Sequence, residues 1–337
     1  MLIKIPPKIW RPKPPCNFQG EDCYKDINGD IFVFKKYGRC LAKPKLDYQI
    51  LREDIITWDS QKHQKEFDKL ITIRQDLDKN IATSLTNIIK RNWDAFSPEG
   101  VLKTVLGYEF CIDTGTAIPY ACKQVPYGVH ESKIIMTEVK ELFSNGWIRP
   151  CPSGGWMSMI VLAPKPHQEH VTHIDDFVWR LCVSYRKLNS VTKPYDFPIP
   201  RNDTALDNFG SGAGRLFWIS LDAKSGFHQV AVKAEDQEKL AFYLPDNSKV
   251  TWTVMPFGPR NAPACYTAIM HQMQLEWMAL FREKYPDCDP NGVILEVTKV
   301  QVGNRQIVDD ILLFGNDVQA LLCFFECICM IFIKYRM

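Results

Sequence analysis

Hydrophobic residues between positions 59 and 93 recur at the spacing of a helix face, and Asp59 or Ser60 stands where an N-terminal cap belongs. This pattern predicts one long or two shorter amphipathic helices. The same spacing over residues 132–150 (SKIIMTEVKELFSNGWIRP) predicts a helix that ends at its Asn-Gly pair, because glycine readily adopts the backbone conformation that follows a helix.

Shorter apolar runs dominate the second half of the chain. They predict strands in three regions, which are residues 156–191, 216–232 and 239–258. A helix is expected from about Asn261 to Lys284, with Asn261 as its cap. After it, RQIVDDILLFG (305–315) predicts two strands joined by a tight turn. Helices and strands interleave irregularly, so the predicted fold class is α+β.

The turn at 305–315 carries two adjacent carboxylates, Asp309 and Asp310. Like charges repel, so this is either a solvated turn or a site where a cation cancels the repulsion. A third carboxylate, Asp222, ends the apolar strand LFWISLD. Phosphoryl-transfer sites with two divalent ions need carboxylates that converge from separate strands. An aspartate at a strand end is common, so the carboxylates alone leave both interpretations open.

The sequence around these carboxylates is more specific. Six segments follow one another in order, namely IDTGTAIPY, GWIRP, WRLCVSYRKLN, SLDAKSGFHQV, VMPFGPRNAPA and IVDDILLF. From about Gly107 to the C-terminus, the chain closely resembles the reverse transcriptases of gypsy-type long-terminal-repeat retrotransposons. The resemblance implies a right-hand polymerase fold with fingers and palm, in which helices pack on an antiparallel palm sheet. It also implies an RNA-directed DNA polymerase.

The resemblance assigns roles to the three carboxylates. Asp222, Asp309 and Asp310 are implied to be catalytic and to hold two Mg²⁺ ions, with Mn²⁺ as a substitute. The partners implied are an RNA or DNA template with a primer, and deoxynucleoside triphosphates. A catalytically inactive relic that still binds nucleic acid is the alternative of a different class.

The resemblance also implies five substrate-binding residues. Lys165 and Arg180 match fingers residues that contact the triphosphate, although a solvated strand edge is the other interpretation for both. Phe227 matches the aromatic side chain beneath the sugar, and Ala223 belongs to the same set. Gly258 is expected where the backbone passes close to template and nucleotide.

Four segments are expected along the chain. Residues 1–55 form a basic, proline-rich arm and residues 56–100 a helical segment. Residues 101–205 form the lead-in and fingers. Residues 206–337 form the palm, with a further fingers insertion near 233–255. Only 27 residues follow Asp310, so most of the late palm, the thumb and the ribonuclease H domain normally present in such a polyprotein are expected to be missing.

Charge and composition refine this organisation. The 337 residues carry a net charge of only +2, and the hydrophobic content of 46% is ordinary for a globular protein. Residues 1–50, however, hold 10 Lys and Arg against 5 Asp and Glu, a local excess of +5. The arm is therefore expected to be either an extended phosphate-binding segment or a disordered leader.

Cysteine usage and hydropathy bear on localisation. The 12 cysteines are scattered and no signal peptide opens the chain, so reduced thiols are expected in an intracellular setting, either a cytoplasmic particle or the nucleus. The longest apolar run, Ala320 to Ile333, is interrupted by Glu326 and is too short to cross a bilayer, so no transmembrane segment and no membrane partner are expected. Cys323, Cys327 and Cys329 in that run are expected to be core side chains.

Three other motifs suggest different chemistry. Asp113-Thr114-Gly115 imitates the active-site loop of an aspartic protease, which must bring two carboxylates together. His167, His170 and His173 could bind zinc, but a solvated hairpin tip explains them better. The stretch GSGAG precedes a strand, so it is a loop and not a dinucleotide fingerprint.

Two positions depart from the family pattern. Ser184 stands where relatives usually carry Asp, and Ile307 stands where Tyr usually precedes the Asp pair. Neither is expected to contact a metal, so both substitutions should tune activity and not abolish it.

Overall fold

The computed structural model describes part of the chain, beginning at residue 23. The described ranges are 23–25, 31–33, 57–72, 77–96, 102–123, 126–151, 155–164, 178–198, 217–286, 302–307 and 310–337. Of these, residues 23–25, 31–33, 302–307 and 310 are described by their backbone alone. The chain divides into two compact units, residues 1–39 and residues 40–337.

The described part of the first unit is one antiparallel pair of strands. β1 (Cys23–Lys25) pairs with β2 (Ile31–Val33), and Tyr24 lies opposite Phe32. This strand pair lies within the basic, proline-rich arm predicted for residues 1–55, and the arm as a whole stays a prediction.

The larger unit contains a three-stranded antiparallel sheet. It consists of β7 (Phe217–Asp222), β11 (Val302–Ile307) and β12 (Asp310–Gly315), in the order β11-β12-β7. The hairpin predicted at 305–315 is therefore confirmed. Burial alternates along β7, with every second residue exposed, as expected for a strand that has one covered face.

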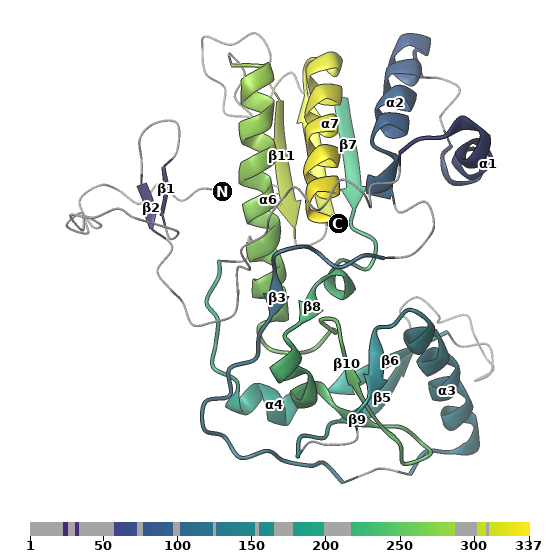
Figure 1. Cartoon of the computed structure of the whole chain (residues 1–337), viewed down its shortest axis with the longest axis vertical. Helices are drawn as coiled ribbons and strands as arrows, with labels where there is room; N and C mark the ends of the chain where they lie inside the picture. The colour runs from purple at the N-terminus through teal and green to yellow at the C-terminus, as the bar shows by residue number, and fades with distance from the viewer. Residues whose placement is uncertain are drawn as a thin grey trace. The chain divides into compact units, whose positions relative to one another are not determined.

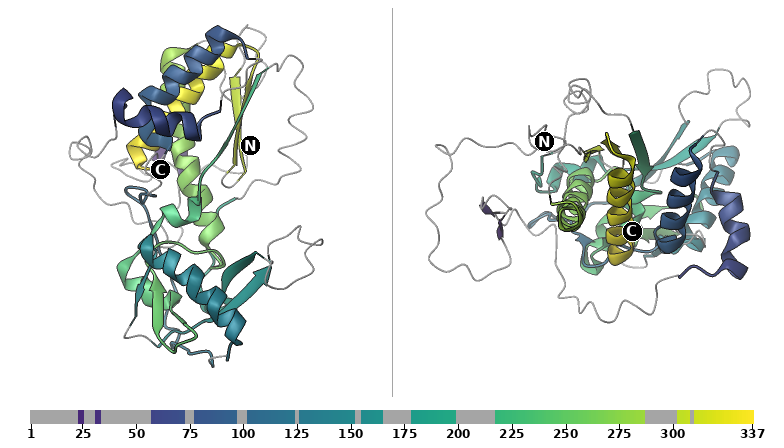
Figure 2. Two further views of the ribbon diagram at one scale, coloured as in Figure 1. Left: turned by 90° about the vertical axis from the view of Figure 1, so that its right-hand side faces the viewer. Right: turned by 90° about the horizontal axis from the view of Figure 1, so that it is seen from above.

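Two long helices cover one side of this sheet. α6 (Ala262–Lys284) and α7 (Val318–Tyr335) pack against each other, and α7 contacts all three strands. Figure 2 shows both helices on the same side of the strands. Ile311 and Leu313 of β12 are almost fully buried. The core of the unit runs through this layer, where Trp277 and Phe281 of α6 have no exposed surface.

The region predicted to be helical before residue 100 forms two helices. α1 (Ser60–Leu70) and α2 (Lys79–Arg91) are followed by a short 3-10 helix, η2 (Trp93–Phe96). The Asp59 carboxylate caps α1 by accepting a hydrogen bond from the Gln61 amide at 2.9 Å, which confirms the cap. α2 packs on α7, and both helices lie near the top of Figure 1.

A second group of elements lies below the palm sheet in Figure 1. Its sheet has the order β4-β10-β9 and stands beside the β5–β6 hairpin and α3. The bounds are β4 (Ile148–Pro150), β5 (Met159–Pro164), β6 (Trp179–Ser184), β9 (Phe242–Tyr243), β10 (Lys249–Trp252) and α3 (Val129–Ser144). A short parallel pair, β3 (Glu109–Phe110) with β8 (Ala231–Val232), adds a further contact. α3 ends at Ser144, with Asn145 as its C-cap and Gly146 next at φ +68°, so the Asn-Gly pair stops the helix as predicted.

Two short helices, α4 (Arg186–Val191) and η4 (Gly226–Gln229), replace backbone that the sequence predicted as strand. A third, η5 (Ala234–Leu240), lies mostly between the predicted strand regions 216–232 and 239–258. In α4 and η5 a single leucine, Leu188 or Leu240, is fully buried. One anchoring apolar residue is too little to give a helical period, which explains why the pattern misled.

Asn261 also differs from its prediction. It occupies the position before α6, but its side chain makes no capping bond. Its Nδ2 donates to the Lys193 carbonyl at 2.7 Å, and its Oδ1 accepts from the Tyr195 amide at 3.0 Å. Asn261 is 3% exposed, so these two bonds satisfy a buried amide and fasten the chain after α4 to the start of α6.

α7 has 18 residues and contains the whole apolar run from Ala320 to Ile333. By length and hydropathy it could cross a membrane, but more than half of it is buried against α6, α2 and the sheet. Glu326 accepts from Arg91 of α2 at 3.0 Å, and Cys327 and Cys329 are buried. Such burial against two helices and a sheet is typical of a core helix. It confirms the prediction that these cysteines are core side chains, and Cys323 beside them is partly buried.

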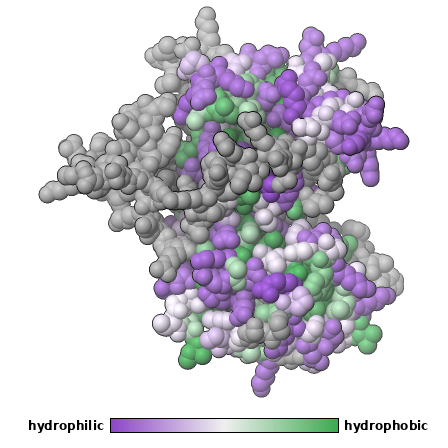
Figure 3. Space-filling view, viewed as in Figure 1, coloured by the Kyte–Doolittle hydropathy of each residue, from purple (hydrophilic) through white to green (hydrophobic). Residues whose placement is uncertain are grey.

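The surface of the unit is mostly polar on the face drawn in Figure 3. Hydrophilic side chains predominate over α1 and α2, and apolar ones appear in small scattered areas. The most exposed large apolar residues are Ile118 and Val129, at 87% and 91%. Isolated exposed apolar side chains of this kind are ordinary.

Candidate active site

Asp222 is the last residue of β7, and its side chain is exposed. The β7–β12 ladder places Asp310 directly opposite it, and the β11–β12 ladder places Ile307 opposite Asp310. Asp309, the Asp310 side chain, and the histidine and GSGAG loops lie outside the described residues. Opposed residues in an antiparallel pair have Cβ atoms about 4.5–5.5 Å apart. The backbone therefore brings two of the three predicted carboxylate positions to one end of the sheet.

The donor chemistry at this end suits a divalent cation. Aspartate oxygens are hard ligands of the kind that Mg²⁺ prefers, and Asp222 reaches solvent at the strand end. Among the described side chains no group of three His, Cys, Asp or Glu converges, and two of the three predicted ligands are not among those side chains. Asp222, Asp309 and Asp310 are thus the residues that could hold metal ions.

The chain turns sharply directly after Asp222. Ala223 is half-buried, and its carbonyl accepts from the Gly226 amide at 3.1 Å. Ser225 has a left-handed backbone, with φ 50° and ψ 41°, and η4 begins at the next residue. A Cβ at Gly226 would lie 2.2 Å from the Tyr266 hydroxyl oxygen of α6. Only glycine lets η4 approach the helix this closely, and the approach brings Phe227 onto α6.

Phe227 is packed among aromatic rings. Its ring stacks on Tyr266 with centroids 5.1 Å apart and an interplanar angle of 11°. Phe257 also contacts it, with centroids 4.9 Å apart and an interplanar angle of 33°. Phe227 is 7% exposed, whereas Phe257 is 61% exposed. Phe257 therefore presents the larger free aromatic surface, a feature that sequence reasoning missed although the residue lies inside VMPFG.

Gly258 follows Phe257 and has φ +107°, a conformation that side-chain-bearing residues rarely adopt. A Cβ there would also lie 3.3 Å from the Tyr185 ring. The Gly258 carbonyl accepts from Nδ2 of Asn189 at 3.0 Å, and the Arg260 amide donates to Oδ1 of Asn189 at 2.8 Å. Asn189 thus fixes this loop to α4. It lies in WRLCVSYRKLN, but the motif gave no sign of this partner.

Arg180 lies on β6, opposite Ala163 of β5, and its side chain is exposed. This position leaves the guanidinium free to meet a ligand. Lys165 lies outside the described residues. Ser184 ends the same strand and is partly buried.

The Asp113 loop is built differently from a protease site. The Asp113 carboxylate accepts from the Gly115 amide at 2.8 Å and forms an ion pair with Lys193 at 2.9 Å. The hydrogen bond from Lys193 lowers the pKa of Asp113. The neighbouring buried carboxylate, Asp236, pairs with Lys239 at 2.6 Å. Aspartic proteases need two carboxylates that share a proton. Here each carboxylate has its own lysine, so the protease interpretation has no support.

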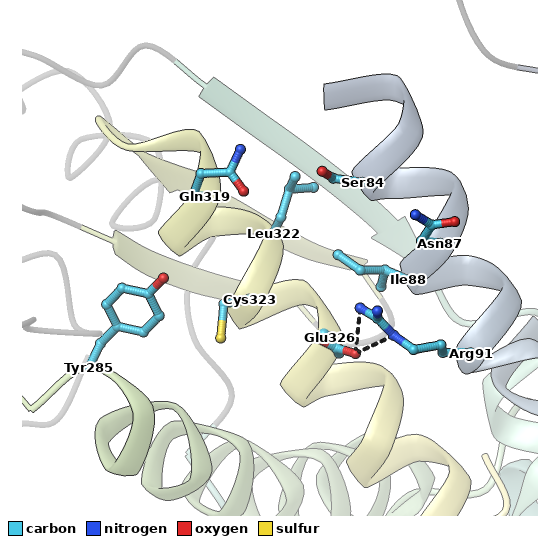
Figure 4. A pocket seen from close by; sticks show the side chains of 9 residues that line it. All are labelled: Ser84, Asn87, Ile88, Arg91, Tyr285, Gln319, Leu322, Cys323 and Glu326. Carbon is cyan, nitrogen blue, oxygen red and sulfur yellow. Dashed lines mark hydrogen bonds and ion pairs between the residues drawn. The ribbon is translucent and has the colours of Figure 1, made fainter. Parts of the chain in front are cut away.

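One pocket of about 290 Å³ lies among α2, α7 and the end of α6 (Figure 4). Its wall is formed by Ser84, Asn87, Ile88, Arg91, Tyr285, Gln319, Leu322, Cys323 and Glu326. Cys323 lines this pocket, and a hydrogen bond with Cys327 lowers the pKa of its thiol to about 7. None of the predicted site residues lines the pocket, so it is separate from the carboxylates.

Comparison with known proteins agrees with this architecture. The family model described as reverse transcriptase (RNA-dependent DNA polymerase) matches residues 163–337. That range is more than half of the chain and includes the β7 and β11–β12 strands. The chain therefore belongs to the reverse transcriptase family.

Its relatives include Pol polyproteins of Drosophila melanogaster transposons. The protein from transposon opus is 32% identical over 167 residues, which are 49% of this chain and 16% of that polyprotein. The protein from transposon 297 is 27% identical over 229 residues, 68% of this chain and 19% of that polyprotein. The protein from transposon gypsy is 29% identical over 169 residues, 50% and 16% respectively. The chain thus spans less than a fifth of these three relatives.

Solved structures show the same fold. The prototype foamy virus protease-reverse transcriptase matches 84% of this chain and 33% of its own, with a TM-score of 0.57 and 17% identity. A foamy viral protease-reverse transcriptase in complex with an RNA/DNA hybrid matches with a TM-score of 0.59. At this identity the likeness concerns the fold alone, which is a polymerase palm with fingers.

Proposed function

We propose that this chain adds deoxynucleotides to a primer 3′-hydroxyl under the direction of an RNA or DNA template. The observation that carries the proposal is the placement of Asp222 opposite Asp310 at the open end of a three-stranded sheet, inside a chain of the reverse transcriptase family. A catalytically inactive relic would have no need to keep Asp222, Asp309 and Asp310 together.

The chain's residues take separate roles in this proposal. Asp222, Asp309 and Asp310 hold the metal ions. When bound, two Mg²⁺ ions, or Mn²⁺ in their place, supply Lewis-acid activation of the primer hydroxyl and charge neutralisation at the pyrophosphate leaving group. Arg180 and Lys165 bind phosphate oxygens, for which a guanidinium fork and an ammonium are suited.

The remaining residues shape the place of the nucleotide. The Phe227 ring stacks on Tyr266 and limits the space at the 2′ position of the sugar. Ala223 and Gly258 have a small side chain or none, so the backbone at these positions can lie close to nucleotide and template. The positive φ of Gly258 is a conformation that glycine adopts readily. An unpaired hydroxyl in such a place costs about 1–3 kcal/mol, so ribonucleotides are disfavoured.

The proposed domain division follows the sheet pairing. Residues 101–205 supply the lead-in and fingers, and residues 206–337 supply the palm. β10 (Lys249–Trp252) pairs with β4 (Ile148–Pro150), which supports a fingers insertion near 233–255 within the palm segment. The relatives are polyproteins several times longer, so we propose that thumb and ribonuclease H segments belong to the same polyprotein as this chain.

Primer extension tests the function. The purified chain is incubated with an RNA template, a labelled DNA primer and the four deoxynucleotides, with Mg²⁺ or with a chelator. We expect template-dependent extension with Mg²⁺ and none with the chelator. Primer-template binding without extension, in the presence of Mg²⁺ or Mn²⁺, would favour the inactive relic instead.

A further inference from the structure

The residue after Phe227, His228, lies among three aromatic rings. Its imidazole stacks on Trp147 with centroids 4.4 Å apart and an interplanar angle of 11°. It also stacks on Trp252 at 5.5 Å and 15°. A third ring, Phe257, meets it edge-on at 5.3 Å and 88°. Stacks of this geometry stabilise a ring's position beyond simple area burial.

The two tryptophans belong to a rigid frame. Trp252 ends β10 and lies opposite Ile148 of β4, and Trp147 directly precedes that strand. The Thr253 amide donates to the Trp147 carbonyl at 2.9 Å, and the Thr253 hydroxyl donates to the Gly146 carbonyl at 2.7 Å. The ladder therefore fixes both indoles relative to each other, and His228 of η4 stacks on both of them.

Stacking holds the imidazole in place. Its Nδ1 is buried without a hydrogen-bond partner among the described residues. Burial also lowers the pKa of His228 to about 4, so the ring is neutral near neutral pH. A neutral ring stacked on two indoles is a packing element, and its orientation follows theirs.

We propose that His228 is a positioning residue that orients Phe227 and Phe257 by anchoring η4 to the sheet of β4 and β10. This inference rests on the proposed function, because it assigns the sugar selectivity of that site to a residue that does not contact the nucleotide. Phe227 adjoins His228 in η4, and Phe257 contacts both of their rings. A shift of the imidazole therefore moves Phe227, the ring proposed to limit the space at the sugar, and the exposed ring of Phe257 that contacts it.

The first test compares His228→Ala with His228→Phe. Alanine removes the ring that stacks on the indoles, whereas phenylalanine keeps a ring of similar size. The quantity measured is the sugar ratio, which is the incorporation efficiency of a ribonucleotide divided by that of the deoxynucleotide. We expect this ratio to rise about tenfold in the alanine variant and to stay within about twofold of the unmodified chain in the phenylalanine variant. The matched control is Phe242→Leu, which alters a fully buried ring that contacts Trp252, with centroids 6.2 Å apart, and that makes no ring contact with His228 among the described side chains. The control should lower stability and leave the sugar ratio unchanged. An equal change of the ratio in His228→Ala and Phe242→Leu would overturn the inference.

The second test is independent of catalysis and so separates this inference from the proposed function. The chain is labelled with 4-fluorophenylalanine, and the fluorine resonances of Phe227 and Phe257 are assigned from single Phe→Leu variants. We expect both resonances to shift or broaden in His228→Ala, and to keep their positions in His228→Phe and Phe242→Leu. Unchanged Phe227 and Phe257 resonances in His228→Ala would refute the positioning role, whether or not the chain extends a primer.

Discussion

Asp222 and Asp310 lie directly opposite each other where β7 meets β12, and each stands at the end of its strand. Carboxylates that lie close together repel unless a cation lies between them. The arrangement is costly for a structural turn and useful for a site that binds divalent ions. It therefore gives the first prediction.

Asp222→Asn should abolish primer extension and leave the fold intact. The amide keeps the size of the side chain but lacks the charge that binds the metal, a loss that typically costs several kcal/mol of transition-state stabilisation. Because Asp222 is exposed, the free energy of unfolding should change by less than about 0.5 kcal/mol. Extension rates and urea denaturation measure the two effects.

Asp68→Asn is the matched control for Asp222→Asn. It removes one carboxylate from the exposed face of α1, where Asp68 accepts a hydrogen bond from Gln64. Its extension rate should equal that of the unmodified chain. Substantial extension by Asp222→Asn would remove this residue from the site.

Phe227→Leu should admit ribonucleotides. A leucine leaves the flat ring of Tyr266 in place but opens space where the 2′-hydroxyl would lie, so the penalty of about 1–3 kcal/mol for an unpaired polar group weakens. Leucine is preferred to alanine for the test, because truncating a buried phenylalanine to alanine typically costs about 3–5 kcal/mol of stability. The measurement is the ratio of incorporation efficiencies for the two sugars.

Phe110→Leu controls for the loss of a buried ring in the Phe227 experiment. Phe110 is 1% exposed and lies in β3, among core residues. This variant should be destabilised without a change in the sugar ratio. If Phe227→Leu behaves in the same way, Phe227 is only a core residue.

Much of the palm could be predicted from the sequence because its signals are local. The apolar run that ends at Asp222 and the two apolar runs on either side of the Asp309-Asp310 pair each border a charged residue, and they indicate strands. A long apolar pattern that begins near a proline predicted the helix from Ala262 to Lys284.

What the sequence could not reveal depends on contacts between distant residues. Asn261 looked like a helix cap, yet its amide bonds to Lys193 and Tyr195, 68 and 66 positions away. The stack around His228 joins Trp147 to Trp252, and no local pattern records that meeting. Tertiary packing decided these roles, so they had to be observed.

Gly226→Ala should destabilise the chain, since its new Cβ would lie 2.2 Å from the Tyr266 hydroxyl oxygen and 2.7 Å from the ring carbon that bears it. Overpacking of this kind typically costs about 1–3 kcal/mol. Tyr266→Phe removes the hydroxyl and should recover part of the loss when both changes are combined. A double-mutant cycle in urea measures this coupling, and strictly additive effects would contradict the close approach of η4 to α6.

The buried His228 predicts a loss of stability in mild acid. Its pKa is about 4 in the folded chain, against an ordinary value of 6.5, because burial disfavours the charged ring. As the pH falls from 6.5 toward 4, the unfolded chain takes up a proton that the folded chain does not. The stability present above pH 6.5 is therefore lost through this window, and below about pH 4 the loss from this residue is complete.

Urea denaturation at about pH 7 and about pH 5 tests the size of this effect, which should be about 2 kcal/mol for His228 alone. Carboxylates also titrate in this range, so the quantity to compare is the pH-dependent loss in the unmodified chain and in His228→Phe. The phenylalanine variant should lose about 2 kcal/mol less, because its ring cannot take up a proton in the unfolded state. Burial also lowers the pKa of His271 on α6, so this residue makes its own contribution to the pH-dependent loss of stability. The variant His271→Phe should remove that contribution and leave the contribution of His228 unchanged. Equal losses in His228→Phe and the unmodified chain would mean that the imidazole reaches solvent and is not enclosed by its stacking on Trp147 and Trp252.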